Sequence, residues 1–414
     1  MAKGKLAIFG GTPVRTKECP RWPVFDESVG PKLLDTLKKG GFSELTGTYA
    51  KEFGQTFAER FGAKYGLTVC NGTAAIHLAL IGLGINPGDE VLVPAHTFIG
   101  SATPILMQNA IPVFVDIDED TYTMDPNDLE RKITEKSKAI IVVHLNGNPA
   151  DMDGIMDIAE KHNLKVIEDC AQAHGAQYKG RYVGTIGDVG TFSFWEDKII
   201  TSLGEGGMVI TSNPDYAKRM AYAKSHGEVK MQEGEERKYV HEFLGYNYRF
   251  TELQAVYGLH ELGKLDNYIE RRRENAAYLT AHLSKLRGIQ PPKETPGGKH
   301  VFYKYVVKID TDELGKNIEW IKNALQAEGI TVSRRYPLPL HLQPLFKEKN
   351  TYGDSQWPFS CTEREYRYEN GLCPVAERLG DRLLTLLVHP TIDKDYLGDV
   401  VTAFEKVWEY LERA

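Results

Sequence analysis

The sequence has few cysteines and no long apolar run. Its five cysteines are scattered and none of them forms a C-x-x-C pair, which argues against a disulfide framework and a structural zinc site. No uncharged apolar stretch approaches the ~20 residues that span a bilayer, and the apolar run near the N-terminus is too short for a signal peptide. We therefore expect a cytoplasmic protein with no membrane partner and no bound metal.

Positive charge is also in short supply. The 414 residues carry a formal net charge of −7, which argues against a nucleic acid or an anionic membrane surface as partner. The one short basic cluster, Arg271–Arg273, lies in a helical pattern and fits a solvated helix face. With 42% hydrophobic and 26% charged residues, the composition is typical of a globular protein with a substantial core.

Between residues 50 and 250, short apolar runs alternate with helical patterns. We predict buried strands at 90–95, 112–117, 139–145, 165–170 and 190–194, and helices at 73–84, 100–110 and 151–163. This alternation indicates an α/β fold with a large, mostly parallel sheet that is covered on both faces. Ligands of such sheets bind beyond the carboxyl ends of the strands, so the residues directly after each strand are the candidates for chemistry.

A smaller C-terminal α+β domain is predicted after one long helical pattern over 251–286. The sequence shows strand patterns at 301–309 and 331–336, and helical patterns at 317–329 and 395–414. We divide the chain into an N-terminal arm (1–26), a large domain (27–262) and a small C-terminal domain (263–414).

Polar motifs follow several of the predicted strands. Asn71-Gly72-Thr73-Ala74 opens a helix, where free N–H groups bind phosphate, although Thr73 also fits a plain N-cap. Asp169 ends a strand; a carboxylate there needs a positive partner such as a protonated pyridine nitrogen, or it caps the next helix. Lys198 precedes the glycine-rich 204–207 and is either a catalytic amine or a solvated lysine.

A further polar loop, GYNYRFTE at 245–252, is either a binding loop or a helix cap at Thr251. Together the motifs GTAAIHLAL, VPAHTFIGSA, VHLNGNPADMD, VIEDCAQAHGA, SFWEDK, LGEGGM, LGYNYRFTELQA and YPLPLHLQP resemble the DegT/DnrJ/StrS family of pyridoxal 5′-phosphate (PLP)-dependent sugar aminotransferases. The resemblance covers nearly the whole chain and implies a fold-type-I PLP aminotransferase.

The resemblance also implies roles for individual residues. Lys198 matches the lysine that holds the cofactor covalently and moves the proton, and Asp169 matches the partner of the pyridine nitrogen. Asn247 matches a residue that reaches the phosphate from the neighbouring subunit, which implies a homodimer with shared active sites. The remaining implied cofactor contacts are Gly72, Thr73, Ala74 and Ser193 at the phosphate, Phe98 stacked on the ring, Ala171 under it and Gln172 beside the ring oxygen. Phe98 also fits an ordinary core position.

The implied substrates are an amino donor, L-glutamate or L-glutamine, and a keto acceptor. The family favours nucleotide-linked keto-sugars, but the blocks LAIFGGTPVRTK and CPVAERLGDRLLTLLVHP resemble the cyclitol and aminohydroxybenzoate branch, whose substrates carry no nucleotide. Tyr336 and His341 match the substrate pocket, and both also fit structural roles. Arg334 and Arg335 are adjacent on a predicted strand, so we expect at most one of them to enter the pocket.

Two other functions stay open as alternatives: an aminotransferase that strictly requires a nucleotide-linked acceptor, and a non-catalytic PLP-binding regulatory protein. Lys198 argues against the dehydratase branch, which has histidine at that position. The chain departs from the family at Glu196-Asp197, which is more acidic than expected. Carboxylates that face a lysine amine raise its pKa, so we expect both to point away from Lys198.

Overall fold

The computed structural model describes residues 4–229 and 239–413. Its central layer is a seven-stranded sheet with the order β1-β9-β8-β5-β4-β2-β3. The strands are β1 (Tyr65–Val69), β2 (Glu90–Pro94), β3 (Ile111–Val115), β4 (Ser137–Val143), β5 (Lys165–Asp169), β8 (Val189–Ser193) and β9 (Gly207–Thr211). The five strands from β8 to β3 are parallel, and β9 is antiparallel to both of its neighbours. The predicted mostly parallel α/β sheet is confirmed.

Both faces of this sheet are buried, which explains why the strands read as unbroken apolar runs. Along β4, Ile141 packs into the core that contains α3, whereas Ile140 packs into the core that contains α2 and α6, because successive side chains alternate between faces. The helices of this part are α1 (Gly30–Lys39), α2 (Tyr49–Phe61), α3 (Gly72–Gly82), α4 (Thr103–Met107), α5 (Pro126–Lys132), α6 (Met152–His162), α7 (Pro214–Ala223) and α8 (Glu252–Leu262). The helix predicted over 100–110 is shorter, since it is reduced to α4 and a preceding 3-10 turn.

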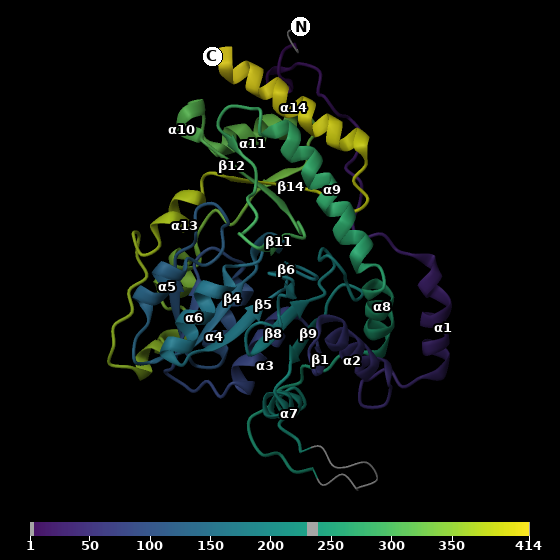
Figure 1. Ribbon diagram of the computed structural model, residues 1–414, viewed down its shortest axis with the longest axis vertical. Coiled ribbons are helices and arrows are strands. Elements are labelled where there is room, and N and C mark those ends of the chain that lie inside the picture. The colour runs from purple at the N-terminus through teal and green to yellow at the C-terminus, as the bar shows by residue number, and fades with distance from the viewer. Residues whose placement is uncertain (1–3, 230–238, 414) are drawn as a thin grey trace.

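The long helical pattern over 251–286 is two helices rather than one. α8 ends at Leu262, and α9 (Leu265–Leu283) begins after Gly263–Lys264. In Figure 1, α9 runs from the large sheet up to the layer that contains α14. The chain therefore changes direction between the two sheets at a glycine, where the helix-forming tendency is weakest.

A four-stranded antiparallel sheet of order β10-β12-β14-β13 forms the second layer. Its strands are β10 (Ile289–Gln290), β12 (Tyr305–Ile309), β13 (Val332–Arg334) and β14 (Leu383–Leu386), and its helices are α10 (Thr311–Leu314), α11 (Ile318–Ala327) and α14 (Lys394–Arg413). α12 (Pro344–Lys347), α13 (Pro374–Leu379) and a small sheet of β6 (Gln177–Tyr178), β7 (Arg181–Tyr182) and β11 (Gly298–Lys299) complete the elements. The strand predicted from residue 301 begins only at Tyr305, which leaves 301–304 as a loop.

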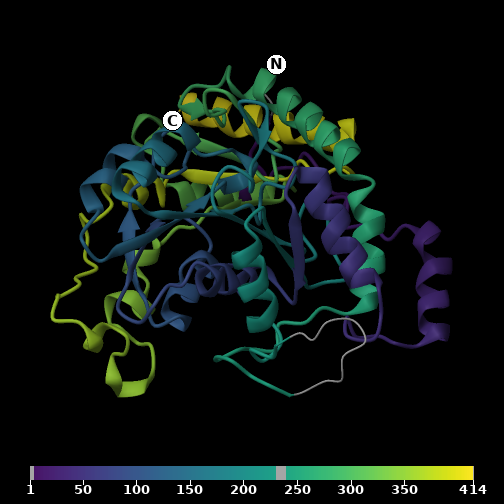
Figure 2. The ribbon, with the colours of Figure 1, turned by 60° about the horizontal axis from the view of Figure 1, so that its bottom comes forward.

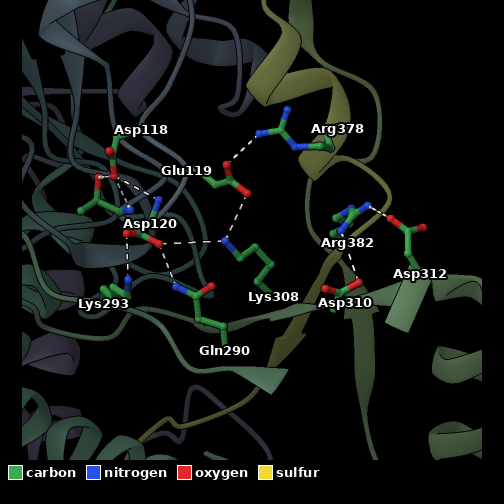
Figure 3. A network of polar contacts seen from close by, with 11 residues as sticks. Asp118, Glu119, Asp120, Gln290, Lys293, Lys308, Asp310, Asp312, Arg378 and Arg382 are labelled. Atoms are coloured by element: carbon green, nitrogen blue, oxygen red, sulfur yellow. Dashed lines mark hydrogen bonds and ion pairs between the residues drawn. The ribbon is translucent and has the colours of Figure 1, made fainter. Parts of the chain in front are cut away.

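A network of ion pairs joins the two layers (Figure 3). The loop after β3 supplies Glu119, which lies 3.3 Å from Lys308 of β12 and 2.7 Å from Arg378 of α13. Asp120 in the same loop lies 2.8 Å from Lys293. Because most of these groups are partly exposed, they fix orientation more than they add stability.

The first helix stands apart from the body of the molecule. Figures 1 and 2 show α1 set off beside α8, connected through the N-terminal arm. Val29, just before α1, packs against Val256 and Tyr257 of α8, while Leu34 and Leu37 of α1 are exposed. No helix among the described residues has both the length and the apolar character that a membrane span requires.

Candidate active site

A cavity of about 520 Å³ lies beyond the carboxyl ends of β5 and β8, where Asp169 and Ser193 end their strands. This is the position that the sheet geometry predicts for a ligand. The predicted site residues that line it are Gly72, Thr73, Phe98, Asp169, Ala171, Gln172, Ser193, Lys198 and Tyr336. Motifs that are far apart in the sequence thus meet around one space.

Asp169 is held rigidly at the wall of this cavity. One carboxylate oxygen accepts a hydrogen bond from Ser101 Oγ at 2.7 Å, and the other accepts from the backbone N–H of Ala171 at 3.0 Å. The residue is 5% exposed. A carboxylate that is fixed in this way keeps lone pairs free for a positively charged group in the cavity.

Lys198 lies on the turn that follows β8. Its Nζ is 4.9 Å from the centre of the Tyr303 ring, and its backbone oxygen accepts a hydrogen bond from the indole N–H of Trp22 at 3.1 Å. Burial lowers the pKa of the Lys198 amine to about 8, and Asp169 works in the opposite direction. A larger neutral fraction near pH 7 is what a nucleophilic or proton-carrying amine needs.

The N-terminus of α3 forms the end of the cavity next to Ser193. The N-cap is Asn71, whose side chain accepts the backbone N–H of Ala74 at 2.8 Å, so Thr73 is not the cap. A Cβ on Gly72 would lie 2.8 Å from the Cβ of Ser193, which means that the helix approaches Ser193 as closely as only glycine allows. The residues Gly72 and Thr73 present the positive end of a helix to the cavity.

Gln172 and Tyr336 meet on the side of the cavity next to the end of β13, which belongs to the four-stranded sheet. Gln172 Oε1 accepts from Arg335 at 2.6 Å and from the backbone N–H of Asn146 at 2.9 Å, and Gln172 Nε2 donates to Tyr336 Oη at 3.1 Å. Arg335 also donates to Asn146 Oδ1 at 2.8 Å. Arg334, by contrast, pairs with Asp381 and lies outside the cavity lining. The prediction that at most one of the two arginines enters is confirmed.

Three non-glycine residues around this wall adopt left-handed backbone conformations. Asn146, Phe302 and Tyr336 have φ values of 58°, 49° and 43°. Such conformations are uncommon for bulky residues and are concentrated at functional sites. Tyr336 lines the cavity itself, and Phe302 directly precedes the lining residues Tyr303 and Lys304. No feature of the sequence indicates these conformations.

The prediction that both acidic residues before Lys198 point away from it is wrong for Asp197. Its carboxylate lies in the lining of the cavity and accepts hydrogen bonds from Lys304 Nζ at 2.7 Å and Tyr303 Oη at 3.2 Å, whereas Glu196 is exposed. The reason is a long-range one, because Lys304 arrives from a loop 107 residues further along the chain. Desolvation lowers the pKa of Lys304, and Asp197 counters this effect.

Three predicted site residues lie outside the cavity lining. The Ala74 N–H is already engaged by Asn71. Asn247 is exposed and pairs across an isolated bridge with Ser225. His341 is completely buried, with Nε2 at 2.9 Å from Glu377, which fits a packing position better than contact with a substrate.

A buried group of possible metal ligands, His144, Glu168 and Cys170, has a structural explanation. The Glu168 carboxylate accepts the backbone N–H groups of Gly184, Ile186 and Gly187 at 2.7 Å each, and His144 Nε2 lies 3.0 Å away. Burial raises the pKa of the Cys170 thiol well above its usual range. A carboxylate that is saturated with hydrogen bonds and a protonated thiol make a poor cation site.

The mostly parallel sheet, the cavity at its strand ends and the lysine in the lining of that cavity are those of an α/β enzyme. The chain belongs to the DegT/DnrJ/EryC1/StrS aminotransferase family, whose model matches residues 26–405. Members of this family depend on PLP.

Named relatives differ in their substrates. The GDP-perosamine synthase of Escherichia coli O157:H7 is 40% identical over 388 aligned positions, with coverage of 92% of this chain and 98% of that protein. The L-glutamine:2-deoxy-scyllo-inosose aminotransferase of Streptomyces kanamyceticus is 36% identical over 426 residues, with coverage of 99% and 98%.

Solved structures show the same fold. An aminotransferase from Psychrobacter cryohalolentis superposes with a TM-score of 0.84 at 35% identity, covering 95% of this chain and 99% of that one. The ntda protein of Bacillus subtilis, solved with bound cofactor PMP, gives a TM-score of 0.81 at 26% identity, with coverage of 95% and 86%.

Proposed function

We propose that this protein transfers an amino group from L-glutamate or L-glutamine to the ketone of a keto-sugar or cyclitol, with PLP bound covalently to Lys198. The observation that carries the proposal is the convergence of a pKa-lowered lysine, a fixed carboxylate and a helix N-terminus on one cavity. When bound, PLP supplies an electron sink for the bond cleavages at the donor α-carbon.

The residues of the cavity fit the three parts of PLP. Asp169, which Ser101 and Ala171 hold in place, would keep the pyridine nitrogen protonated. The phosphate would lie at Gly72, Thr73 and Ser193, where the tight approach of the helix leaves room for no larger residue. Phe98, Ala171 and Gln172 would hold the ring, and Lys198 Nζ would carry the proton between donor and cofactor.

Arg335 gives the donor a place to bind. Its guanidinium partners are amide oxygens, on Asn146 and Gln172, and no carboxylate among the described residues forms an ion pair with it. A partly buried guanidinium without a counter-charge favours an anion, and its planar fork matches a carboxylate. We therefore infer that Arg335 binds a carboxylate of the amino donor, next to Tyr336.

The acceptor that we propose carries no nucleotide. Two phosphates call for clustered positive charge, but Arg334 is turned away and Lys304 is already neutralised by Asp197. The resemblance of both ends of the chain to the cyclitol branch favours the same choice. The relatives include enzymes named for nucleotide-linked sugars and for cyclitols, so a strictly nucleotide-dependent aminotransferase is the competing hypothesis.

A substrate screen tests the function. Holoprotein should show a change of cofactor absorbance with L-glutamate or L-glutamine, and the spectrum should revert when a cyclitol ketone or a free keto-sugar is added. Nucleoside diphosphates should not inhibit this reaction at the concentrations at which a cyclitol ketone or a free keto-sugar reverts the spectrum. Micromolar inhibition by a nucleoside diphosphate, without response to free sugars, would favour the nucleotide-linked alternative, and protein that takes up no PLP would favour a regulatory role.

Borohydride reduction tests the attachment of the cofactor. It should fix PLP to the peptide that contains Lys198, and the Lys198→Met variant should not be labelled. Label on a different lysine would contradict the assignment.

We also propose that the protein acts as a homodimer with shared active sites. Six apolar side chains between residues 24 and 45 are about half exposed, namely Val24, Phe25, Leu34, Leu37, Phe42 and Leu45. Exposed apolar side chains that gather in one segment support a protein interface at this segment. Asn247, which is exposed and outside the cavity of its own chain, would reach the phosphate of the neighbouring subunit.

Subunit exchange tests this arrangement. When Lys198→Ala and Asn247→Ala chains are mixed, a heterodimer with shared sites contains one site with both changes and one intact site. Each heterodimer should therefore recover about half of the activity of a wild-type dimer. Proven exchange without recovery would show that Asn247 serves its own subunit.

A further inference from the structure

The loop that carries Lys198 brings a second charged pair into the active site. Asp197 immediately precedes Lys198, and its Oδ2 accepts hydrogen bonds from Lys304 Nζ and Tyr303 Oη. The side chain of Lys304 is 12% exposed and that of Asp197 is 31% exposed. The pair is therefore partly shielded from solvent, and charges in such a place act over longer distances than fully exposed ones.

Tyr303 is the point around which the cations of the cavity gather. The Lys198 Nζ lies 4.9 Å from the centre of its ring, the Lys304 Nζ lies 4.8 Å from it, and the Arg335 Cζ lies 6.0 Å from it. Lys198 and Lys304 are thus two amines on one aromatic ring, and the hydroxyl of that ring donates to Asp197. Because Lys198 and Lys304 lie against the same ring, a change in the charge of Asp197 or Lys304 must alter the electrostatic potential at the Lys198 amine.

Two of the other charged groups around Lys198 already have proposed roles. Asp169 faces Lys198 from the end of β5, and we assign it to the cofactor nitrogen. Arg335 faces Lys198 from the end of β13 in the four-stranded sheet, and we assign it to the donor carboxylate. Glu205 also lines the cavity, from the glycine-rich turn, where it is exposed. His174 lies behind, and burial lowers its pKa to about 3, so it is neutral. Apart from the exposed Glu205, the Asp197–Lys304 pair is the charged feature of the described lining to which no contact with the cofactor is assigned.

We propose that Asp197 and Lys304 are positioning residues that together set how tightly the Lys198 amine holds its proton. The carboxylate favours the protonated amine and the ammonium group favours the neutral amine, and the hydrogen bond between them keeps the two influences balanced. The proposal rests on the proposed role of Lys198, and it explains the acidic residue that stands directly before a lysine required in its neutral form.

The pair therefore acts as a fixed electrostatic setting rather than as a catalytic contact. Removal of the carboxylate leaves Lys304 as an uncompensated cation and lowers the pKa of Lys198. Removal of Lys304 leaves an uncompensated carboxylate and raises the pKa of Lys198. The two single changes shift the pKa of Lys198 in opposite directions. A role in packing alone would not predict shifts of opposite direction.

The test is competitive acetylation of the apoprotein over a range of pH, with the rate at Lys198 followed by peptide mass spectrometry. We expect the midpoint of the Lys198 rate profile to fall by about one pH unit in Asp197→Asn and to rise by about one unit in Lys304→Met, as for a unit charge at this range in a partly screened site. The double variant should lie near the wild type. The matched control is Glu196→Gln, which removes the neighbouring, exposed carboxylate and should leave the midpoint unchanged.

The outcomes are decisive for each variant. An unchanged midpoint, or shifts of both variants in one direction, overturns the proposal. If Asp197→Asn does not fold, Lys304→Met alone tests the proposal, because only an upward shift of its Lys198 midpoint agrees with the proposed role of the pair. Borohydride mapping of the holoprotein separates the two hypotheses: label on another lysine refutes the proposed function, whereas unshifted midpoints with label on Lys198 refute the role of the pair.

Discussion

The indole N–H of Trp22 lies 3.1 Å from the backbone oxygen of Lys198 and donates a hydrogen bond to it. The N-terminal arm thus fixes the backbone of the residue at the centre of the active site. The Trp22 ring itself stacks on His389 and meets Tyr268 edge-on, and the Arg272 guanidinium lies 5.2 Å from it. The arm is part of the active-site structure.

We predict that Trp22→Phe destabilises the protein by about 1 kcal/mol, because it keeps most of the ring contacts but leaves a backbone oxygen unpaired. Urea unfolding of the apoprotein measures this change. Trp357→Phe is the control, since it also removes an indole hydrogen bond, to Asn109, but at an exposed position away from the cavity. Only Trp22→Phe should also weaken PLP binding, and equal PLP affinity in the two variants would show that the arm does not support Lys198.

Gly72→Ala should weaken PLP binding by at least about tenfold, or roughly 1.4 kcal/mol. The added Cβ would lie 2.8 Å from the Cβ of Ser193, so the N-terminus of α3 must move away from the phosphate position. Gly30→Ala is the matched control, because Gly30 also begins a helix and its Cβ would meet no atom within 4 Å. Fluorescence titration with PLP compares the two, and unchanged affinity in Gly72→Ala would place the phosphate elsewhere.

Much of the fold follows from local sequence patterns, because strands that are buried on both faces appear as continuous apolar runs. The five strands of the parallel part were therefore predictable, and so was the end of the sheet at which Asp169 and Lys198 meet. The break at Gly263–Lys264 was not, since a single glycine is often tolerated within a helix. The direction of α9 depends instead on its packing against the four-stranded sheet.

The parts of the site that the sequence did not reveal all depend on distant residues. Asp197 turns inward because it pairs with Lys304, which is 107 residues away in the sequence. Trp22, which bonds to the backbone of Lys198, is 176 residues away from it in the sequence. The left-handed conformation of Tyr336 is likewise imposed by its surroundings. Local composition predicts which residues are polar, but the partner of each polar group is decided by tertiary structure.

Asp169→Asn should reduce transamination by about 100-fold or more, which corresponds to about 2.7 kcal/mol in the activation barrier. An amide cannot make the charge-assisted bond that keeps a pyridine nitrogen protonated. Single-turnover kinetics with L-glutamate measure the effect. Ser101→Ala should give a smaller loss, near tenfold, because it removes the hydrogen bond that orients Asp169 but leaves the charge. A normal rate in Asp169→Asn would require another role for this carboxylate.

Lys198→Met should stabilise the apoprotein at pH 7 and lose this advantage as the pH rises. The pKa of Lys198 is lowered to about 8 in the folded protein, against about 10.4 in an unfolded chain. Below pH 8 the amine is protonated in both states, so the folded wild type bears the full cost of a desolvated charge. Between pH 8 and about 10.4 the unfolded state binds more protons than the folded state, so the stability of the wild type rises with pH.

The free energies of unfolding of wild type and Lys198→Met should therefore converge across this window. Urea unfolding of both apoproteins at pH 7, 8, 9 and about 10 gives the comparison, in which the titration of all other groups cancels. Lys64→Met, which removes an exposed lysine, controls for the loss of one charge from the molecule. A difference between wild type and Lys198→Met that stays constant from pH 7 to about 10 would show that the folded protein does not lower the proton affinity of Lys198. The amine would then need the bound cofactor, rather than the cavity, to become neutral.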